Sequence, residues 1–240
     1  MIKGILFDLN GTLIDIATDE YGDDVYRTTA GFLRYSGVDI APELLRERYF
    51  SLNREQRRRS QEAFPEFDAV RIFHDIILEF SAAGETDSRR IALGAAQVFR
   101  ASGCRKLQLY PGVFETLEYL RNRYYLSALS DGQSAWAQPE MRAVGLEKFF
   151  HQLTVSGDLG FRKPDRRIFE YALRAMKMSP DEVIFVGNDM YRDIYGGREA
   201  GMRTVFFRSN QGDQSTRLAE ADYIIYEFPE LLRALEFFGG

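Results

Sequence analysis

The sequence has few of the residues that form disulfides or bind transition metals. It contains one cysteine, Cys104, and two histidines, His74 and His151, among 240 residues. A single cysteine excludes an internal disulfide and a cysteine-based zinc cluster, and two histidines are too few for a histidine-rich metal site. Any metal must therefore be held by oxygen ligands, which suit hard cations such as Mg²⁺.

Long apolar runs and an excess of positive charge are also missing. The N-terminus offers only Ile5, Leu6 and Phe7 before Asp8, so it has neither a signal-peptide core nor a run of about 20 apolar residues that could span a bilayer. The net charge of −5 argues against nucleic acid as the main partner, because backbone binding needs a surplus of Lys and Arg. We expect a cytoplasmic protein that acts without membrane or nucleic acid, and the sequence leaves its oligomeric state open.

What the chain does contain is an alternation of short apolar runs and helical patterns. Residues 2–8 form an apolar run that ends in Asp8 before the Asn10-Gly11 turn, which predicts a buried strand with Asp8 at its end. Further strands are expected at 125–129, 152–155, 183–186, 204–207 and 223–226, and helices at 113–123, 166–176, 192–200 and 229–238. This alternation predicts an α/β fold, a doubly wound and mainly parallel sheet with helices on both faces.

Residues 16–106 have a different pattern. They contain no convincing strand, and apolar residues from Val70 to Phe80 recur at helical spacing. About four helices are expected, separated at Pro42, Pro65, Gly84 and Gly103. We therefore predict a catalytic core made of residues 1–15 and 107–240, with an all-helical domain inserted at residues 16–106.

Two strand ends carry polar groups that could act on a substrate. Ligands of open α/β sheets bind beyond the carboxyl ends of the strands. Asp8 could be a nucleophile or a cation ligand there, although an aspartate before a glycine turn is also a common structural feature. Ser130 and the amides of Asp131 and Gly132 could hold a phosphate oxygen, or Ser130 could simply cap a turn.

Later segments supply positive charge and further oxygen ligands. Lys163 precedes Pro164 and Asp165, which begin a helix, so its ammonium could neutralise a phosphoryl group or lie in solvent. Asn188, Asp189 and Asp193 follow another strand and offer oxygen atoms within one helical turn of each other. They could share Mg²⁺ with Asp8 or cap the next helix.

The order of these segments resembles the four motifs of the haloacid dehalogenase superfamily. The matching segments are FDLNGTL at residues 7–13, Ser130, KPD at residues 163–165 and VGNDMYRDI at residues 186–194. The resemblance spans the chain and places a helical cap after the first motif. It implies a phosphatase-type hydrolase with a Rossmann-like core, acting on a small phosphorylated metabolite.

The resemblance also implies roles for individual residues. Asp8 would attack phosphorus and form a transient aspartyl phosphate. Ser130 and the amides of Asp131 and Gly132 would bind the phosphoryl oxygens, while Lys163 would hold Asp8 and the phosphate in register. Mg²⁺ would bridge Asp8 and the substrate, in a reaction that depends on positioning and charge neutralisation.

The first motif departs from the family pattern at its acid/base position. Family phosphatases usually have an aspartate two residues after the nucleophile, and here that position holds Asn10. An amide cannot exchange a proton near neutral pH, and losing such a group costs about 10²–10⁴ in rate. The backbone carbonyl of Asn10 could still bind Mg²⁺. Asn10 is either a natural variant or an engineered substitution, and the sequence is consistent with both explanations.

The second and fourth motifs also depart from the pattern. Asn188 stands where an aspartate is common, and we expect the neighbouring Asp189 to be the direct carboxylate ligand, with Asn188 or Asp193 beside it. The expected metal ligands are thus Asp8, Asn10, Asn188 and Asp189. Asp131 stands where an asparagine is common and puts negative charge close to the proposed phosphate.

Two other functions are consistent with these residues. A 2-haloacid dehalogenase also lacks the second aspartate, attacks carbon and needs no metal. A catalytically silent protein would bind phosphorylated metabolites without turnover. For the substrate, the arginines at 54, 57, 58 and 59 could bind an anionic leaving group, or they could form a solvated helix face.

Overall fold

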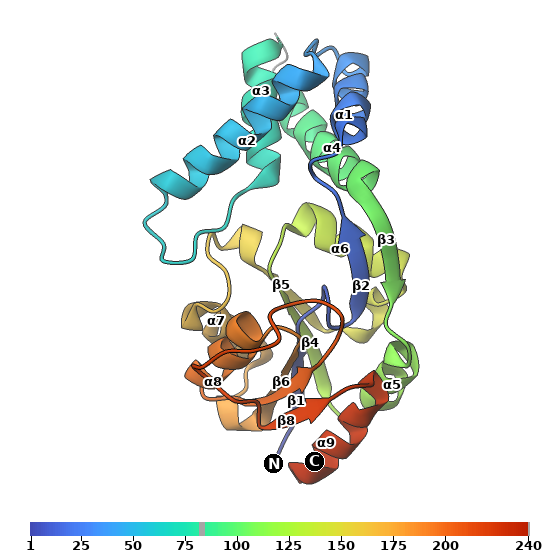
Figure 1. Cartoon of the computed structure of the whole chain (residues 1–240), viewed down its shortest axis with the longest axis vertical. Helices are drawn as coiled ribbons and strands as arrows, with labels where there is room; N and C mark the ends of the chain where they lie inside the picture. Colours follow the sequence, from blue (N-terminus) through green and yellow to red (C-terminus); the bar gives the residue numbers. More distant parts are fainter. Residues whose placement is uncertain (82–84, 240) are drawn as a thin grey trace.

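A parallel six-stranded sheet forms the body of the protein in a computed structural model that describes residues 1–81 and 85–239 (Figure 1). The strand order is β5-β4-β1-β6-β7-β8. The strands are β1 (Gly4–Phe7), β4 (Tyr125–Ser130), β5 (Gln152–Val155), β6 (Val183–Gly187), β7 (Arg203–Phe207) and β8 (Tyr223–Ile225). The predicted α/β fold is confirmed.

Helices cover both faces of this sheet because successive strand residues point to opposite sides. In β1, Ile5 and Phe7 pack with α5 (Val113–Leu120), α6 (Ser134–Ala143) and α9 (Leu231–Phe237). Leu6 packs on the other face with α7 (Arg166–Met176) and the residues that follow α8 (Gly196–Glu199). A π-helix, Met190–Tyr195, leads into α8 where the sequence predicted one helix at 192–200.

The predicted helical insertion consists of α1 (Asp23–Tyr35), α2 (Pro42–Arg59), α3 (Ala69–Phe80) and α4 (Glu85–Gly103). These helices bury an aromatic cluster of their own, which includes Tyr26, Tyr49, Phe73 and Phe99. Pro42 begins α2 and Gly103 ends α4, whereas Gly84 lies outside the described residues. No helix in the described part of the chain is long and apolar enough to cross a membrane.

Two strands connect the sheet with the helical insertion. They are β2 (Ile14–Thr18) and β3 (Cys104–Leu109), which pair antiparallel with each other. The expectation of no strand between residues 16 and 106 was therefore wrong at both ends of the segment. The two strands form a sheet of their own, separate from the six-stranded sheet, and β3 is largely half-exposed. Neither strand contains the continuous apolar run that marks the buried strands. Helix α6, which contains Pro139, was also missed.

Candidate active site

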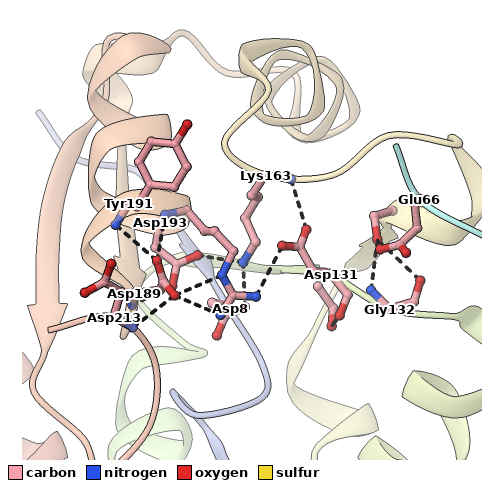
Figure 2. Close-up of polar contacts among 12 residues, drawn as sticks. Asp8, Glu66, Asp131, Gly132, Lys163, Asp189, Tyr191, Asp193 and Asp213 are labelled. Carbon is pink, nitrogen blue, oxygen red and sulfur yellow. Dashed lines mark hydrogen bonds and ion pairs between the residues drawn. The ribbon is translucent and has the colours of Figure 1, made fainter. Parts of the chain in front are cut away.

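The carboxyl ends of β1, β4 and β6 lie side by side and gather Asp8, Ser130 and the fourth-motif residues at one edge of the sheet. Lys163 comes from the connection before α7 and is 2% exposed. Its Nζ lies 2.6 Å from Asp8 Oδ1 and 2.6 Å from Asp193 Oδ1 (Figure 2). The structure therefore brings the predicted nucleophile and the predicted lysine into direct contact, with Asp193 as a third partner.

Lys163, Asp8 and Asp193 form a buried triad, and the pKa values of Lys163 and Asp193 depend on the other charges in it. Burial alone would lower the pKa of Lys163, but Asp193 and Asp8 hold it above its usual value. Burial raises the pKa of Asp193 to about 6, against the opposing effect of Lys163. Lys163 therefore stays charged at neutral pH, and Asp193 takes up a proton as the pH falls through about 6.

Asn188 is placed beside the second oxygen of Asp8. The Thr12 hydroxyl lies 2.8 Å from Asp8 Oδ2 and 3.1 Å from Asn188 Oδ1. Gly11 has φ +90°, and a Cβ there would lie 2.3 Å from Asn188 Nδ2. Glycine thus permits both the turn after Asp8 and the close approach of the Asn188 amide.

The carboxylate of Asp189 is occupied by donors from its own loop and from the Asp213 segment. It accepts hydrogen bonds from the backbone N–H groups of Tyr191, Arg192 and Asp213 and pairs with the Arg192 guanidinium at 2.9 Å (Figure 2). Burial would raise the pKa of Asp189, but these donors hold it below its usual range. The contacts of Asp189 match the helix-capping explanation.

In the turn after β4, one hydroxyl makes no strong hydrogen bond, whereas two other polar groups already have hydrogen-bond partners. The buried Ser130 Oγ makes only a 3.5 Å contact with the Asp131 carbonyl. Asp131 Oδ1 accepts the backbone N–H of Lys163 at 3.0 Å, and burial raises the pKa of this carboxyl. Gly132 donates its N–H to Ser156 Oγ at 2.9 Å. Ser130 is thus the predicted phosphate-binding side chain that remains available.

A cavity of about 180 Å³ lies between this turn and the helical insertion. Asn10, Ser130, Asp131 and Gly132 line it from the core, and Arg57 and Glu66 line it from the insertion. Arg57 is the one of the four predicted arginines on this wall, and arginines 54, 58 and 59 are exposed.

Sequence reasoning missed Glu66, Gln133 and Arg162 on the same wall. Arg162 directly precedes Lys163 in the sequence, and this position could have indicated that Arg162 lies at the site. Glu66 had no such signal, because its location depends on the docking of the loop after α2.

The oxygen atoms around Asp8 could hold a hard cation. In the described part of the chain, no three His, Cys, Asp or Glu side chains form a metal cluster. Asn188 Oδ1 and Asp8 Oδ2 nevertheless both contact the Thr12 hydroxyl, and Asn10 Oδ1 is buried without a hydrogen-bond partner among the described residues. One carboxylate with neutral oxygens and water is a donor set that Mg²⁺ accepts.

The match to known sequences decides the family. A family described as haloacid dehalogenase-like hydrolase matches residues 2–201. The chain belongs to this family. It is therefore a hydrolase, as the motifs predicted.

Similar proteins carry phosphatase and dehalogenase names. Glyceraldehyde 3-phosphate phosphatase of Methanothermobacter thermautotrophicus is 28% identical over 93% of this chain and 91% of that protein. The Pyrococcus furiosus protein of the same name is 35% identical, but the match spans 54% of this chain and about half, 55%, of its own length. A 2-haloacid dehalogenase from Pseudomonas syringae has a TM-score of 0.68 and 24% identity, with 99% of this chain and 100% of that chain covered. This last likeness bears on the fold alone.

Proposed function

We propose that this hydrolase is a Mg²⁺-dependent phosphatase that cleaves a small phosphoric monoester through an aspartyl-phosphate intermediate. The contact of the buried Lys163 ammonium with Asp8 carries the proposal. A cation in this place holds the Asp8 carboxylate in position and offsets the charge of an incoming phosphate. The phosphatase names of relatives that match over most of this chain support the same reaction class.

The chain's own groups account for most steps of this reaction. Asp8 forms a bond to phosphorus while the bond to the leaving oxygen breaks, and water then hydrolyses the aspartyl phosphate. The uncommitted Ser130 hydroxyl is free to donate to a phosphoryl oxygen. Asn10 cannot protonate the leaving oxygen or activate the water, so we propose a reduced rate on alkyl esters.

For the metal we propose Asp8, the Asn188 amide oxygen and the backbone carbonyl of Asn10 as ligands. The Thr12 contacts place Asn188 beside Asp8, whereas the Asp189 carboxylate is occupied by four donors in the fourth motif and the Asp213 segment. We therefore assign Asp189 to holding the loop, in place of the direct ligand role expected from the sequence. Bound Mg²⁺ would supply positive charge that neutralises phosphate oxygens.

Experiments can distinguish two other functions from the proposed phosphatase reaction. Asn10 is compatible with a 2-haloacid dehalogenase, in which Asp8 attacks carbon and expels halide without a metal. A silent binding protein would hold phosphate esters without turnover. Halide release in the presence of EDTA identifies the first, and tight binding without phosphate release at any pH identifies the second.

Phosphate release from glyceraldehyde 3-phosphate and p-nitrophenyl phosphate tests the proposal directly. We expect release by the unmodified protein with Mg²⁺ and none with EDTA, and no release by Asp8→Asn, because an amide cannot replace the carboxylate as the nucleophile. Asp39→Asn changes an exposed carboxylate of the insertion and should behave like the unmodified protein. Substantial activity of a pure, folded Asp8→Asn preparation would contradict the nucleophile assignment.

A further inference from the structure

The wall of the cavity above Ser130 carries one more positive than negative side chain. Four arginines and three carboxylates line it: Arg57, Arg100, Arg162 and Arg192, with Glu66, Asp131 and Glu140. The phosphate itself is to be bound below this wall, by Ser130 and Lys163. The charge on the wall therefore faces the part of the substrate that leaves.

Two of the four arginines are already paired with carboxylates, and Arg57 donates from Nε to Asn53 Oδ1 at 3.2 Å. Arg100 Nε lies 2.6 Å from Glu140 Oε1, and its guanidinium stacks on Trp136 at 5.0 Å. Arg192 binds Asp189 at 2.9 Å and lies 3.7 Å from Asp131. The charges of these two arginines are balanced by the protein.

Arg57 and Arg162 share the single remaining carboxylate, Glu66. Both oxygens of Glu66 are occupied, one by the Phe67 N–H at 3.1 Å and the other by Ser156 Oγ at 2.9 Å. Arg57 approaches Glu66 only to 3.6 Å, which is too long for a hydrogen bond. Arg162 acts on Glu66 through its charge, but its side chain makes no hydrogen bond or ion pair within the described residues.

The position of Arg162 is fixed by its backbone. Its N–H donates to the Phe64 carbonyl at 3.0 Å, and the neighbouring Phe161 bridges to Pro65 of the insertion. The next residue, Lys163, contacts Asp8. Arg162 is therefore held one residue from the catalytic lysine, on the cavity wall, with all its guanidinium donors available.

We propose that the substrate's leaving group carries a carboxylate and that Arg162, assisted by Arg57, binds it; this rests on the proposed phosphatase function. A planar guanidinium matches a carboxylate in a two-point hydrogen-bonded pair. The unpaired guanidinium of Arg162 can balance one carboxylate, whereas a second phosphate would bring about two negative charges. A volume of about 180 Å³ has room for about six water molecules, which suits a leaving group of a few atoms.

Hydrolysis of two matched esters tests the proposal. 3-Phosphoglycerate and glycerol 3-phosphate differ by a carboxylate in place of a hydroxymethyl group. We expect kcat/KM to favour 3-phosphoglycerate at least tenfold, and Arg162→Gln to lower it about 10- to 100-fold for that ester alone. Arg162→Lys should recover part of the loss, and Arg58→Gln, on the exposed face of α2, should change neither ester.

The outcomes separate this proposal from the phosphatase assignment. If both esters are hydrolysed without preference, or Arg162→Gln affects them equally, the carboxylate site is wrong and the phosphatase function stands. If neither ester is hydrolysed, calorimetric binding of the same two compounds decides. Tighter binding of 3-phosphoglycerate that is lost in Arg162→Gln would support the carboxylate site even though the phosphatase reaction fails. Equal affinities for the two compounds would overturn the carboxylate site.

Discussion

Lys163 joins Asp8 and Asp193 in the interior of the core through two contacts of 2.6 Å. Removing the ammonium leaves two buried carboxylates facing each other without a cation. We expect Lys163→Ala to abolish turnover and to lower the free energy of unfolding by about 3–5 kcal/mol, measured by urea denaturation. Lys148→Ala, at an exposed ion pair, should cost less than about 1 kcal/mol. A loss at Lys163 as small as this control would show that the buried triad is not needed for stability.

Asp193 gives the reaction a predicted dependence on pH. Its pKa, raised by burial to about 6, means that the carboxylate is protonated as pH falls below that value. The protonated side chain no longer accepts fully from Lys163 and from the N–H groups of Asn188 and Asp189. We expect kcat/KM to fall about tenfold per pH unit below pH 6. A profile that stays flat from pH 7 to pH 5 would contradict this assignment.

The variant Asp193→Asn provides the control for this pH effect. It removes the titrating group while keeping a side chain of similar size. We expect low activity without the acidic limb of the profile. If the limb persists in Asp193→Asn, another group in the site or in the substrate causes it.

Part of the site could be predicted because its residues follow recognisable strand ends. Asp8, Ser130 and Lys163 lie where the motifs placed them, at one edge of the sheet. The different placement of Asn188 and Asp189 could not be predicted. It depends on the π-helix that follows and on the Asp213 segment, which donates its N–H to Asp189 from a distant part of the chain.

At the scale of elements, the loop between α2 and α3 connects the insertion to the active-site turns. Gln133, at the start of α6, donates to the Phe67 carbonyl at 2.6 Å and accepts the Ala69 N–H at 2.9 Å. Gln133→Ala leaves both backbone groups without these partners, at a cost of about 1–3 kcal/mol. We expect faster amide hydrogen exchange over residues 64–69 and a higher KM.

Ser134→Ala is the matched control for this prediction. Ser134 bonds to Asp158, which lies in the core, and so the change does not touch the insertion. Exchange over residues 64–69 should be unaffected in this variant. Equal protection of residues 64–69 from amide hydrogen exchange in Gln133→Ala and Ser134→Ala would mean that Gln133 does not hold the loop.

The strands of the parallel sheet could be predicted, although the edge strands β5 and β8 are only partly buried. All six strands of the parallel sheet are short apolar runs between turns, and each was expected within a few residues of its observed bounds. The pair β2 and β3 was missed because its strands are partly exposed and depend on pairing with each other. The loop that delivers Glu66 has no periodic pattern at all, and its position follows from contacts with residues 156–162.

At the scale of the whole molecule, the sheet and the helical insertion each have their own hydrophobic cluster. The antiparallel pair β2–β3 joins them, as Figure 1 shows in the long connection between the sheet and helices α1–α4. The cavity lies where the two parts meet, so the core supplies the reacting groups and the insertion supplies part of the wall around the leaving group.

The site is proposed to carry out phosphoryl transfer without a proton-transfer group at residue 10. The most direct test of this proposal is the rate of Mg²⁺-dependent phosphate release from an alkyl phosphate by Asn10→Asp relative to the unmodified protein. We predict a rise of about 10²–10⁴, and a smaller gain for p-nitrophenyl phosphate, whose leaving group needs no proton. A variant that is no faster on any phosphate ester, while either form releases halide from a 2-haloacid without metal, would contradict the account and establish the dehalogenase reaction.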